Sequence, residues 1–256
     1  MTYSLTTETM RFEYSESEID QPILWERHCH ARFEMIAVAE GDINVMLEGK
    51  CYRLKKNQAA IISPLYYHAV NANEKGSYRR VTALFGMDMI PKPLRSEFES
   101  GEIRIATLPW ADIERLKELC RRDDPSFYEP LSQSLMIQIF YEMLKETKSS
   151  VGIETDVFLQ KSLQYIDRHL HEKILLDDLA RYTSRSKSSF CHLFEEKMNI
   201  SPKQYILQKK LALASKLIGE GVPPTVAAAQ VGYDNYGNFY RLYCKNFGKS
   251  PTHNKE

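Results

Sequence analysis

The sequence predicts an α+β fold in two domains. The N-terminal domain is expected to be a β-barrel of the jelly-roll type with a helical hairpin, and the C-terminal domain to be all-α with two helix-turn-helix units. Three observations predict this: strand-like alternation up to about residue 90, helical spacing of apolar residues after it, and two similar segments within the last hundred residues. At 256 residues, the chain exceeds the ~100–200 residues typical of one domain.

Short strands separated by turns account for the first part of the chain. In the stretch DINVMLEG, the apolar residues Ile43, Val45 and Leu47 occupy alternate positions, as in a half-buried strand. The glycine-containing turns AEGD and EGKC flank this strand at hairpin spacing, and NQAAIISP and YRRVTALFGM supply further strands. Strands of this kind predict a closed sandwich or jelly-roll barrel.

Two helices follow the strands. Pro109 precedes the first, in which Ile113, Leu116 and Leu119 recur at helical spacing, and a second is expected to begin at Pro130. The second helix carries one apolar stripe, made of Leu131, Leu135, Ile139, Met143 and Leu144. This stripe either packs onto its own barrel or forms the face of a homodimer, and the sequence leaves both alternatives open.

The polar, glycine-ended stretch ETKSSVG (146–152) is the expected linker between domains at 1–148 and 154–256. The second domain contains a repeat. Phe190 and Phe194 are four residues apart, as are Phe239 and Tyr243, and a Ser-Pro pair closes each unit twelve residues after the first aromatic residue. This spacing predicts two helix-turn-helix units.

Each unit is expected to contain a small residue where its two helices cross, Ala180 in the first and Ala228 in the second. Ser186 and Gly237 are the predicted N-caps of the second helices. The stretch LALASKLI is the predicted connecting helix between the units. On the second helices, the aromatic positions are expected to face inward and the polar ones outward. The outward faces are either solvated surfaces or DNA-reading surfaces.

Composition limits the remaining possibilities. Residues 154–256 contain 15 Lys and Arg against 11 Asp and Glu, a net charge of +4, which leaves 19 against 23, or −4, for residues 1–153. A basic C-terminal domain suits a polyanionic partner. No apolar run is long enough to span a membrane, and the N-terminus lacks the form of a signal peptide. The five scattered cysteines indicate reduced thiols, so we expect a cytoplasmic protein.

Residues 154–256 resemble the DNA-binding domain of the AraC/XylS family of bacterial transcription regulators. The resemblance is strongest in VGYDNYGNFYRLYCKNFGKSP, and SKSSFCHLF and NISPKQYILQKKLALASKLI support it. Ser184 departs from the family pattern, which usually has glycine in the first turn. The resemblance implies a homodimer that binds double-stranded DNA, with RNA polymerase as a further partner. It implies DNA contacts from Arg185, Ser186, Lys187, Ser188, Ser189, His192, Tyr236, Gly237, Asn238, Arg241, Lys245 and Lys249.

The N-terminal domain resembles the cupin-like effector domains joined to such regulators. HCHARFEMIAVAEG matches the spacing H-x-H-x3-E-x6-G of the first cupin motif, and NQAAIISPLYYHAV resembles the second motif. The resemblance implies that His28, His30, Glu34 and His68 converge in the barrel. These side chains would line the pocket of an organic effector, hold a divalent metal, or serve the structure alone. No cofactor other than such a metal is expected.

Together these resemblances imply a ligand-responsive, sequence-specific DNA-binding regulator that is not an enzyme. One alternative is a metal-dependent cupin enzyme, such as a dioxygenase or isomerase, fused to a DNA-binding domain. Another is a regulator whose barrel only dimerises. In each case the two recognition helices are expected to enter successive major grooves, about 34 Å apart.

Overall fold

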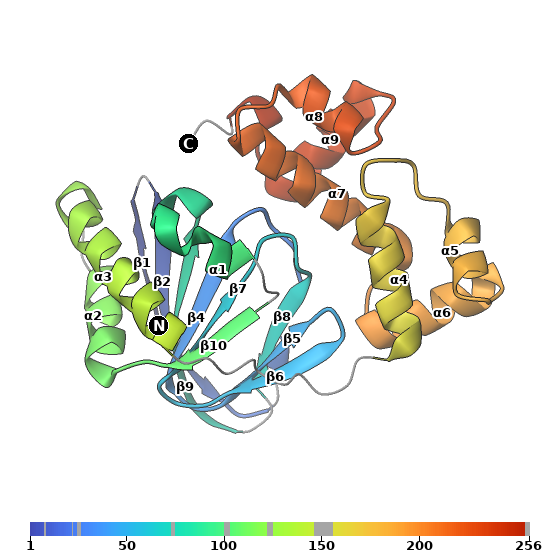
Figure 1. Cartoon of the computed structure of the whole chain (residues 1–256). Helices are drawn as coiled ribbons and strands as arrows, with labels where there is room; N and C mark the ends of the chain where they lie inside the picture. The colour runs from blue at the N-terminus through green and yellow to red at the C-terminus, as the bar shows by residue number, and fades with distance from the viewer. Residues whose placement is uncertain are drawn as a thin grey trace.

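The computed structural model describes residues 1–7, 9–21, 23–24, 27–72, 75–99, 103–121, 125–145 and 156–253. Strands dominate up to residue 107, and the chain from residue 156 onward is helical (Figure 1). The expected division into a sheet-rich N-terminal domain and a helical C-terminal domain is therefore confirmed. The predicted linker, 146–152, lies outside the described residues.

Two antiparallel sheets make up the N-terminal domain. One contains β1 (Thr2–Thr6), β2 (Met10–Ile19), β4 (Phe33–Glu40), β7 (Gln58–Ile62), β9 (Gly76–Phe85) and β10 (Ile103–Thr107), in the order β1-β2-β9-β4-β7-β10. The other contains β3 (Ile23–Leu24), β5 (Ile43–Leu47), β6 (Lys50–Leu54) and β8 (His68–Ala72), in the order β3-β8-β5-β6. Among the described strands the two sheets stay separate, so the closed barrel predicted from the sequence is not observed.

The two sheets face each other across an apolar core. Ile36 and Val38 of β4 meet Val45 and Leu47 of β5 in this core. The turn EGKC joins β5 to β6 as a hairpin, as predicted, but the turn AEGD does not form a hairpin. It carries the chain from β4 in one sheet to β5 in the other, because Gly41 adopts a left-handed φ of 83° that lets the chain change sheets.

Helices cover the other face of the six-stranded sheet. They are α1 (Arg95–Glu99), α2 (Trp110–Cys120) and α3 (Pro125–Lys145), with short 3-10 turns at η1 (Met87–Met89) and η2 (Lys92–Leu94). Helix α2 is confirmed where it was predicted, after Pro109. Helix α3 begins at Pro125, so the predicted start at Pro130 is wrong, and Pro130 lies inside the helix.

Most of the predicted apolar stripe of α3 does not form an outer face. Ile139 and Met143 are fully buried, and Leu135 nearly so, in the core between α3, α2 and the six-stranded sheet. Packing onto its own domain is therefore the correct alternative for these residues. Leu131, which was predicted to belong to the stripe, is instead exposed, and so is Tyr141.

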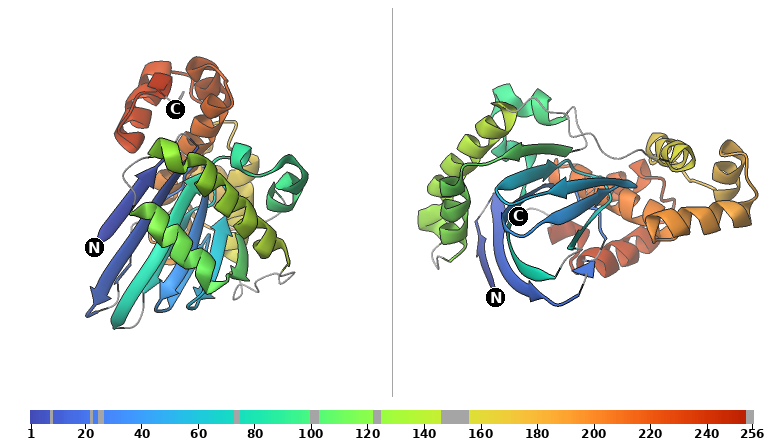
Figure 2. Two further views of the ribbon diagram at one scale, coloured as in Figure 1. Left: turned by 90° about the vertical axis from the view of Figure 1, so that its left-hand side faces the viewer. Right: turned by 90° about the horizontal axis from the view of Figure 1, so that it is seen from below.

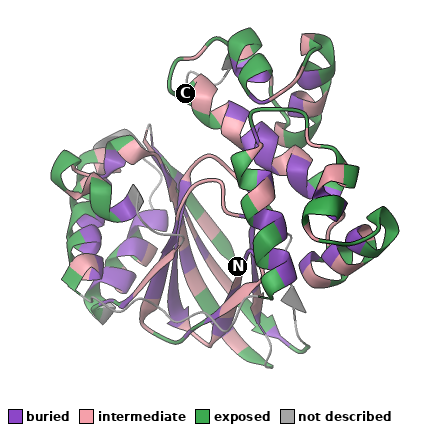
Figure 3. Ribbon diagram, turned by 45° about the vertical axis from the view of Figure 1, so that its right-hand side comes forward, coloured by how far each residue is buried: buried purple, intermediate pink, exposed green. Residues whose placement is uncertain are grey.

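The C-terminal domain is built from six helices and a 3-10 turn within the described residues. They are α4 (Val157–Arg168), α5 (Leu176–Tyr182), α6 (Lys187–Met198), α7 (Pro202–Gly219), α8 (Pro224–Gln230), α9 (Tyr236–Phe247) and η3 (Pro251–His253). Buried positions lie where these helices meet and exposed positions on their outer sides (Figure 3). Among the described helices, none is both long and apolar enough to cross a membrane.

The elements are stacked in layers (Figure 2). Helices α2 and α3 lie on one side of the sheets, and the C-terminal domain lies on the opposite side. The contact with the C-terminal domain runs through the β5–β6 turn, at Glu48 and Gly49, and through Cys29 and Tyr67 next to the strands. One face of the four-stranded sheet contributes to the core of the sandwich.

The burial of α3 yields a stability prediction. Replacing the buried Ile139 with alanine should reduce the free energy of unfolding by about 2–5 kcal/mol, because the methyl groups it removes leave a cavity. Replacing Ile137, which is 44% exposed on the same helix, should change it by at most about 0.5 kcal/mol. Urea denaturation of both variants checks this, and equal effects would contradict the observed orientation of α3.

Candidate functional site

The alternation of side chains along two strands positions the predicted histidines and carboxylate. Glu34 shares the face of β4 that carries Ile36 and Val38 into the sandwich. His68 shares the face of β8 that carries Val70 into the same core. The segment that contains His28 and His30 runs beside β8, where His28 and His68 exchange backbone hydrogen bonds of 3.0 and 2.9 Å. All four residues therefore meet at one end of the sandwich.

The four side chains form a histidine–glutamate cluster, His28, His30, Glu34 and His68, whose candidate ligand atoms all lie within 4.8 Å of one another. Glu34 Oε2 stands at the centre, 2.8 Å from His68 Nε2, 3.0 Å from His30 Nε2 and 3.6 Å from His28 Nε2. Glu34 and His68 are buried, whereas the His28 side chain is 48% exposed. The cluster is thus open to solvent on the His28 side.

Backbone contacts fix the orientation of two of the rings. His30 Nδ1 lies 2.9 Å from the Arg32 carbonyl oxygen, and His68 Nδ1 lies 2.8 Å from the Tyr66 carbonyl oxygen. Because a carbonyl oxygen only accepts hydrogen bonds, each Nδ1 must carry the hydrogen. In a neutral ring, Nε2 then presents a lone pair to the Glu34 carboxylate. A lone pair facing a carboxylate oxygen is repelled by it. A second proton on the ring, or a cation bound by both the nitrogen and the carboxylate, removes this repulsion.

The environment favours the charge states that bind cations. Burial alone would raise the pKa of Glu34, but its contacts with the three histidines hold that pKa well below the usual range. Burial lowers the pKa of His30, and this effect outweighs the attraction of Glu34 for the imidazolium. An ionised carboxylate beside a neutral imidazole is the donor set of a divalent metal site.

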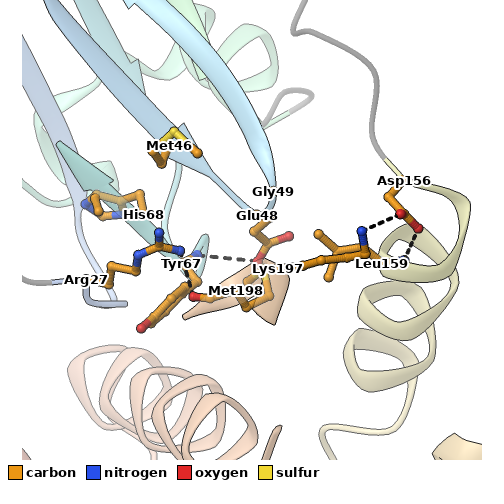
Figure 4. Close-up of a pocket in the computed structure, with 11 residues that line it drawn as sticks. Arg27, Met46, Glu48, Gly49, Tyr67, His68, Asp156, Leu159, Lys197 and Met198 are labelled. Atoms are coloured by element: carbon orange, nitrogen blue, oxygen red, sulfur yellow. Dashed lines mark hydrogen bonds and ion pairs between the residues drawn. The ribbon is translucent and has the colours of Figure 1, made fainter. Parts of the chain in front are cut away.

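The donor geometry and the size of the neighbouring space both fit a small occupant. Zinc binds imidazole nitrogens and carboxylate oxygens at about 2.0–2.2 Å, which places neighbouring donors roughly 3 Å apart. Glu34 Oε2 lies 2.8–3.6 Å from the three ring nitrogens. A cavity of about 180 Å³ adjoins His68 between the two domains, and Arg27, Glu48 and Lys197 also line it (Figure 4). This is below the ~300–1,000 Å³ of pockets for drug-sized ligands.

The predicted repeat in the C-terminal domain is confirmed in detail. The first unit consists of α5 and α6, the second of α8 and α9, and α7 connects them (Figure 1). Both first helices end in the same way: Arg185 N donates to Ala180 O at 2.8 Å, and Tyr233 N donates to Ala228 O at 3.0 Å. Each turn contains a left-handed residue four positions after its alanine, Ser184 in one unit and a glycine in the other.

The caps of the second helices agree with the sequence in one unit only. Ser186 caps α6, since its side chain accepts a hydrogen bond from Ser189 N at 3.3 Å. The predicted cap Gly237 is wrong. Asn235 caps α9 by accepting from Asn238 N at 2.9 Å, so the helix starts before Gly237, which lies in its first turn.

The predicted orientation of the second helices is confirmed for the residues that decide it. Phe190 and Phe194 of α6 and Phe239 and Tyr243 of α9 are fully buried. The outward positions of α6 are exposed, among them Ser188, Ser189, His192 and Glu195. On α9, Gly237, Asn238, Arg241 and Lys245 are exposed, as is Lys249 beyond it, while Tyr236 is half-buried.

Several of these polar residues have neighbours within the domain. Arg241 Nη2 donates to Asn238 Oδ1 at 3.4 Å, a contact between two residues of the same exposed face. Lys187 forms an exposed ion pair with Asp177 at 2.8 Å. The guanidinium of Arg185 lies over the Phe158 ring, 5.1 Å from its centre. Arg241 is therefore oriented by an amide on its own face.

One positioning residue was missed in the sequence. Lys210, on α7, donates to the Val231 carbonyl oxygen at 2.6 Å and also to the Glu172 carbonyl oxygen. These carbonyls belong to the end of α8 and to the loop after α4, so one ammonium group joins the two units. Gly232 lies against the same loop, and a Cβ there would come within 2.7 Å of the Glu172 backbone. A lysine in an amphipathic helix gives no sequence signal of this role.

Two helix-turn-helix units with exposed polar faces, arranged as a repeat around one connecting helix, define a DNA-binding protein of the double helix-turn-helix class. The comparisons with known proteins agree. Residues 179–256 match the protein family described as "Helix-turn-helix domain".

The relatives are transcriptional regulators. The chain is 26% identical over 216 residues to the probable transcriptional regulator LumQ of Photobacterium leiognathi, a match that covers 80% of this chain and 85% of LumQ. It is 23% identical over 235 residues to the uncharacterized HTH-type transcriptional regulator YobQ of Bacillus subtilis, covering 89% and 88%. It is 30% identical over 130 residues to the uncharacterized regulator YdiP of Escherichia coli, covering 50% and 43%.

Among solved structures, ToxT from Vibrio cholerae aligns with 96% of this chain and 97% of its own, at 10% identity and a TM-score of 0.45. The matched helix-turn-helix family and the named relatives identify the class. Residues 179–256 carry an AraC-type helix-turn-helix domain, and the relatives that the chain resembles are named as transcriptional regulators.

The matched turns give a paired prediction. Ser184 has a φ of 56°, which costs an L-residue about 1 kcal/mol, so Ser184→Gly should raise the free energy of unfolding of the C-terminal domain by about that amount. Gly232→Ala should lower it by more than ~1 kcal/mol, because the methyl group meets the Glu172 backbone at a φ of 75°. Thermal denaturation measures both. A destabilising Ser184→Gly change would show that the turn is not strained.

Proposed function

We propose that this protein is a sequence-specific regulator whose DNA affinity responds to a small ligand bound in its N-terminal domain. In this proposal, residues 1–148 form the cupin-like effector and dimerisation domain, and residues 154–256 form the DNA-binding domain. The observation that carries the proposal is the convergence of His28, His30, Glu34 and His68 in a domain that packs directly on the DNA-binding helices. The two-sheet sandwich supports the jelly-roll assignment.

We further propose that a divalent metal ion is part of that ligand. The hydrogen on Nδ1 of His30 and His68 leaves Nε2 free to donate a lone pair, and Glu34 supplies an anionic oxygen. When bound, such a cation would attract anionic or neutral oxygen groups of a small molecule. The exposed side of His28 gives access to solvent. The relatives are regulators, so we assign no catalytic role to the cluster.

The metal assignment is tested by substitution. After dialysis against a divalent metal such as Zn²⁺, purified wild-type protein should hold one equivalent of that metal. Glu34→Gln and His30→Ala should each reduce the affinity for the metal at least tenfold. Metal content by mass spectrometry and competition with a chelator measure this. His192→Ala, on the exposed face of α6, is the matched control and should bind like the wild type. Unchanged binding in both cluster variants would remove the cluster from the site.

For DNA recognition, we propose that the exposed faces of α6 and α9 enter the major groove. Before and on α6 these residues are Arg185, Ser186, Lys187, Ser188, Ser189 and His192, and on and beyond α9 they are Tyr236, Gly237, Asn238, Arg241, Lys245 and Lys249. Arg241 has the geometry to contact guanine with two hydrogen bonds, and Asn238 orients it. Lys245 and Lys249 lie farther along and suit phosphate contacts.

Arg241→Ala should therefore relax the preference at one base pair, at a cost of about 1–3 kcal/mol for the favoured sequence. Lys245→Ala should weaken binding to all sequences about equally. It should also reduce the slope of log K against log salt concentration by roughly one unit. Selection from a randomised DNA library, followed by salt titration, distinguishes the two effects. An unchanged sequence preference in Arg241→Ala would mean that another face of α9 contacts the bases.

We propose that the protein works as a homodimer in the cytoplasm, where the DNA of its bacterial relatives lies, and contacts RNA polymerase from the promoter. The exposed face of α3, which carries Leu131, Ile137 and Tyr141, supports a homodimer, since these large apolar side chains are 44–59% exposed in the single chain. Sedimentation should give a dimer for the wild type and a folded monomer for Tyr141→Lys. A monomeric wild type at high concentration would exclude this role of α3.

A further inference from the structure

The contact between the two domains centres on one buried carboxylate. Glu48 lies in the turn between β5 and β6, and its Oε1 accepts hydrogen bonds from Tyr205 Oη at 2.9 Å and from Lys209 Nζ at 2.8 Å. Both of these donors lie on α7, in the DNA-binding domain. Gly49, the next residue, lies so close to Leu159 of α4 that a Cβ would come within 2.1 Å of that side chain. The turn is therefore fitted against two helices of the other domain.

The groups in this contact are almost completely enclosed. Lys209 is 3% exposed and Tyr205 is fully buried, and Asp167 provides Lys209 with a second carboxylate at 2.9 Å. Burial alone would lower the pKa of Lys209, but Glu48 and Asp167 outweigh it and raise that pKa, so the lysine is charged. If the domains separated, Lys209 would keep Asp167 of its own domain, whereas Glu48 would lose both of its donors, so the contact favours the docked arrangement of the two domains.

Backbone neighbours connect this contact to the histidine–glutamate cluster. Cys29, between His28 and His30, packs into the apolar core of the DNA-binding domain, and so does Tyr67, the neighbour of His68. Tyr67 stacks edge-on against Tyr205 with ring centres 5.3 Å apart.

The backbone of Tyr67 also contacts Glu48. Glu48 N donates to the Tyr67 carbonyl oxygen at 3.0 Å, and Tyr67 N approaches Glu48 Oε1 at 3.4 Å (Figure 4). Arg27, next to His28, donates to the Met198 carbonyl oxygen at 2.6 Å, at the end of α6. The segments that hold the cluster thus also hold the first DNA-reading helix.

We propose that the contact of Glu48 with Lys209 and Tyr205 transmits the occupancy of the histidine–glutamate cluster to the DNA-binding domain. This inference rests on the proposed function. A ligand in the cluster repositions His28, His30 and His68, and each displacement moves Cys29 or Tyr67 against α4 and α7. Because the ligand and DNA then bias the same domain contact, each must change the affinity of the other by the same factor.

The test compares three proteins: the wild type, Glu48→Gln, and Asp42→Asn as the matched control. Asp42 belongs to the same hairpin but pairs with Arg53 on the surface, away from the DNA-binding domain. Fluorescence anisotropy gives the Kd for a selected DNA site in saturating Zn²⁺ and in chelator. The wild type and Asp42→Asn should show about a fivefold or larger difference in Kd. Glu48→Gln should still bind both Zn²⁺ and DNA. Its Kd for DNA should differ by less than about twofold between Zn²⁺ and chelator.

Each contrary result has a distinct meaning. The same Zn²⁺ effect in Glu48→Gln as in the wild type overturns this inference and leaves the proposed function intact. No Zn²⁺ binding by the wild type overturns the proposed metal and this inference with it. If circular dichroism shows that Glu48→Gln does not fold, Lys209→Met replaces it, with the same expected loss of the Zn²⁺ effect. In that variant, small-angle X-ray scattering should also show an increased radius of gyration, which a contact without influence on domain arrangement would not produce.

Discussion

The alternation of side chains along an extended backbone is the constraint on which the rest of this structure depends. In the segment 28–30, the two histidines point toward Glu34 and the cysteine between them points into the helical domain. In the same way, His68 points toward the cluster and Tyr67 points into the helical domain. Two stretches of backbone, hydrogen-bonded to each other, therefore carry a candidate ligand site on one face and a domain interface on the other.

Helix α7 extends this arrangement through the DNA-binding domain. Its adjacent residues Lys209 and Lys210 point in different directions, because successive helical residues are rotated by about 100°. Lys209 meets Glu48 of the N-terminal domain, and Lys210 joins the loop after α4 to the end of α8. One helix thus holds the first unit against the N-terminal domain and the second unit against the first. The spacing of the two DNA-reading helices and their relation to the cluster depend on the same element.

Local patterns were sufficient to predict most of the elements, and the resemblance to the cupin motifs predicted the cluster. The period-two alternation around Val45, the repeat of aromatic residues at 190 and 239, and the spacing of His28, His30 and Glu34 each describe a feature within a short stretch of chain. Errors arose where two local rules competed. Asn235 outcompeted Gly237 as a helix cap because its side chain supplies a hydrogen-bond acceptor. Pro130 lies inside a helix that starts five residues earlier, at Pro125, so this proline does not mark the start of the helix.

Other features depend on contacts that no local pattern records. The apolar residues of α3 were compatible with a dimer face or with the domain core, and only the packing of Ile139 against α2 and the sheet decides between them. The turn AEGD has hairpin composition, yet its strands belong to different sheets. Glu48 and Lys209 are 161 residues apart and look like ordinary surface residues in the sequence. Their burial follows from the docking of two domains.

The central claim is that this chain reads DNA with two helices under the control of its N-terminal domain. Hydroxyl-radical footprinting of the full-length protein on a selected site, with Zn²⁺ and with chelator, tests it most directly. The account predicts two protected regions on one face of the duplex, about one helical turn or 34 Å apart, whose protection at a fixed protein concentration differs between the two conditions. Protected regions on opposite faces of the duplex, or identical protection in both conditions, would contradict it.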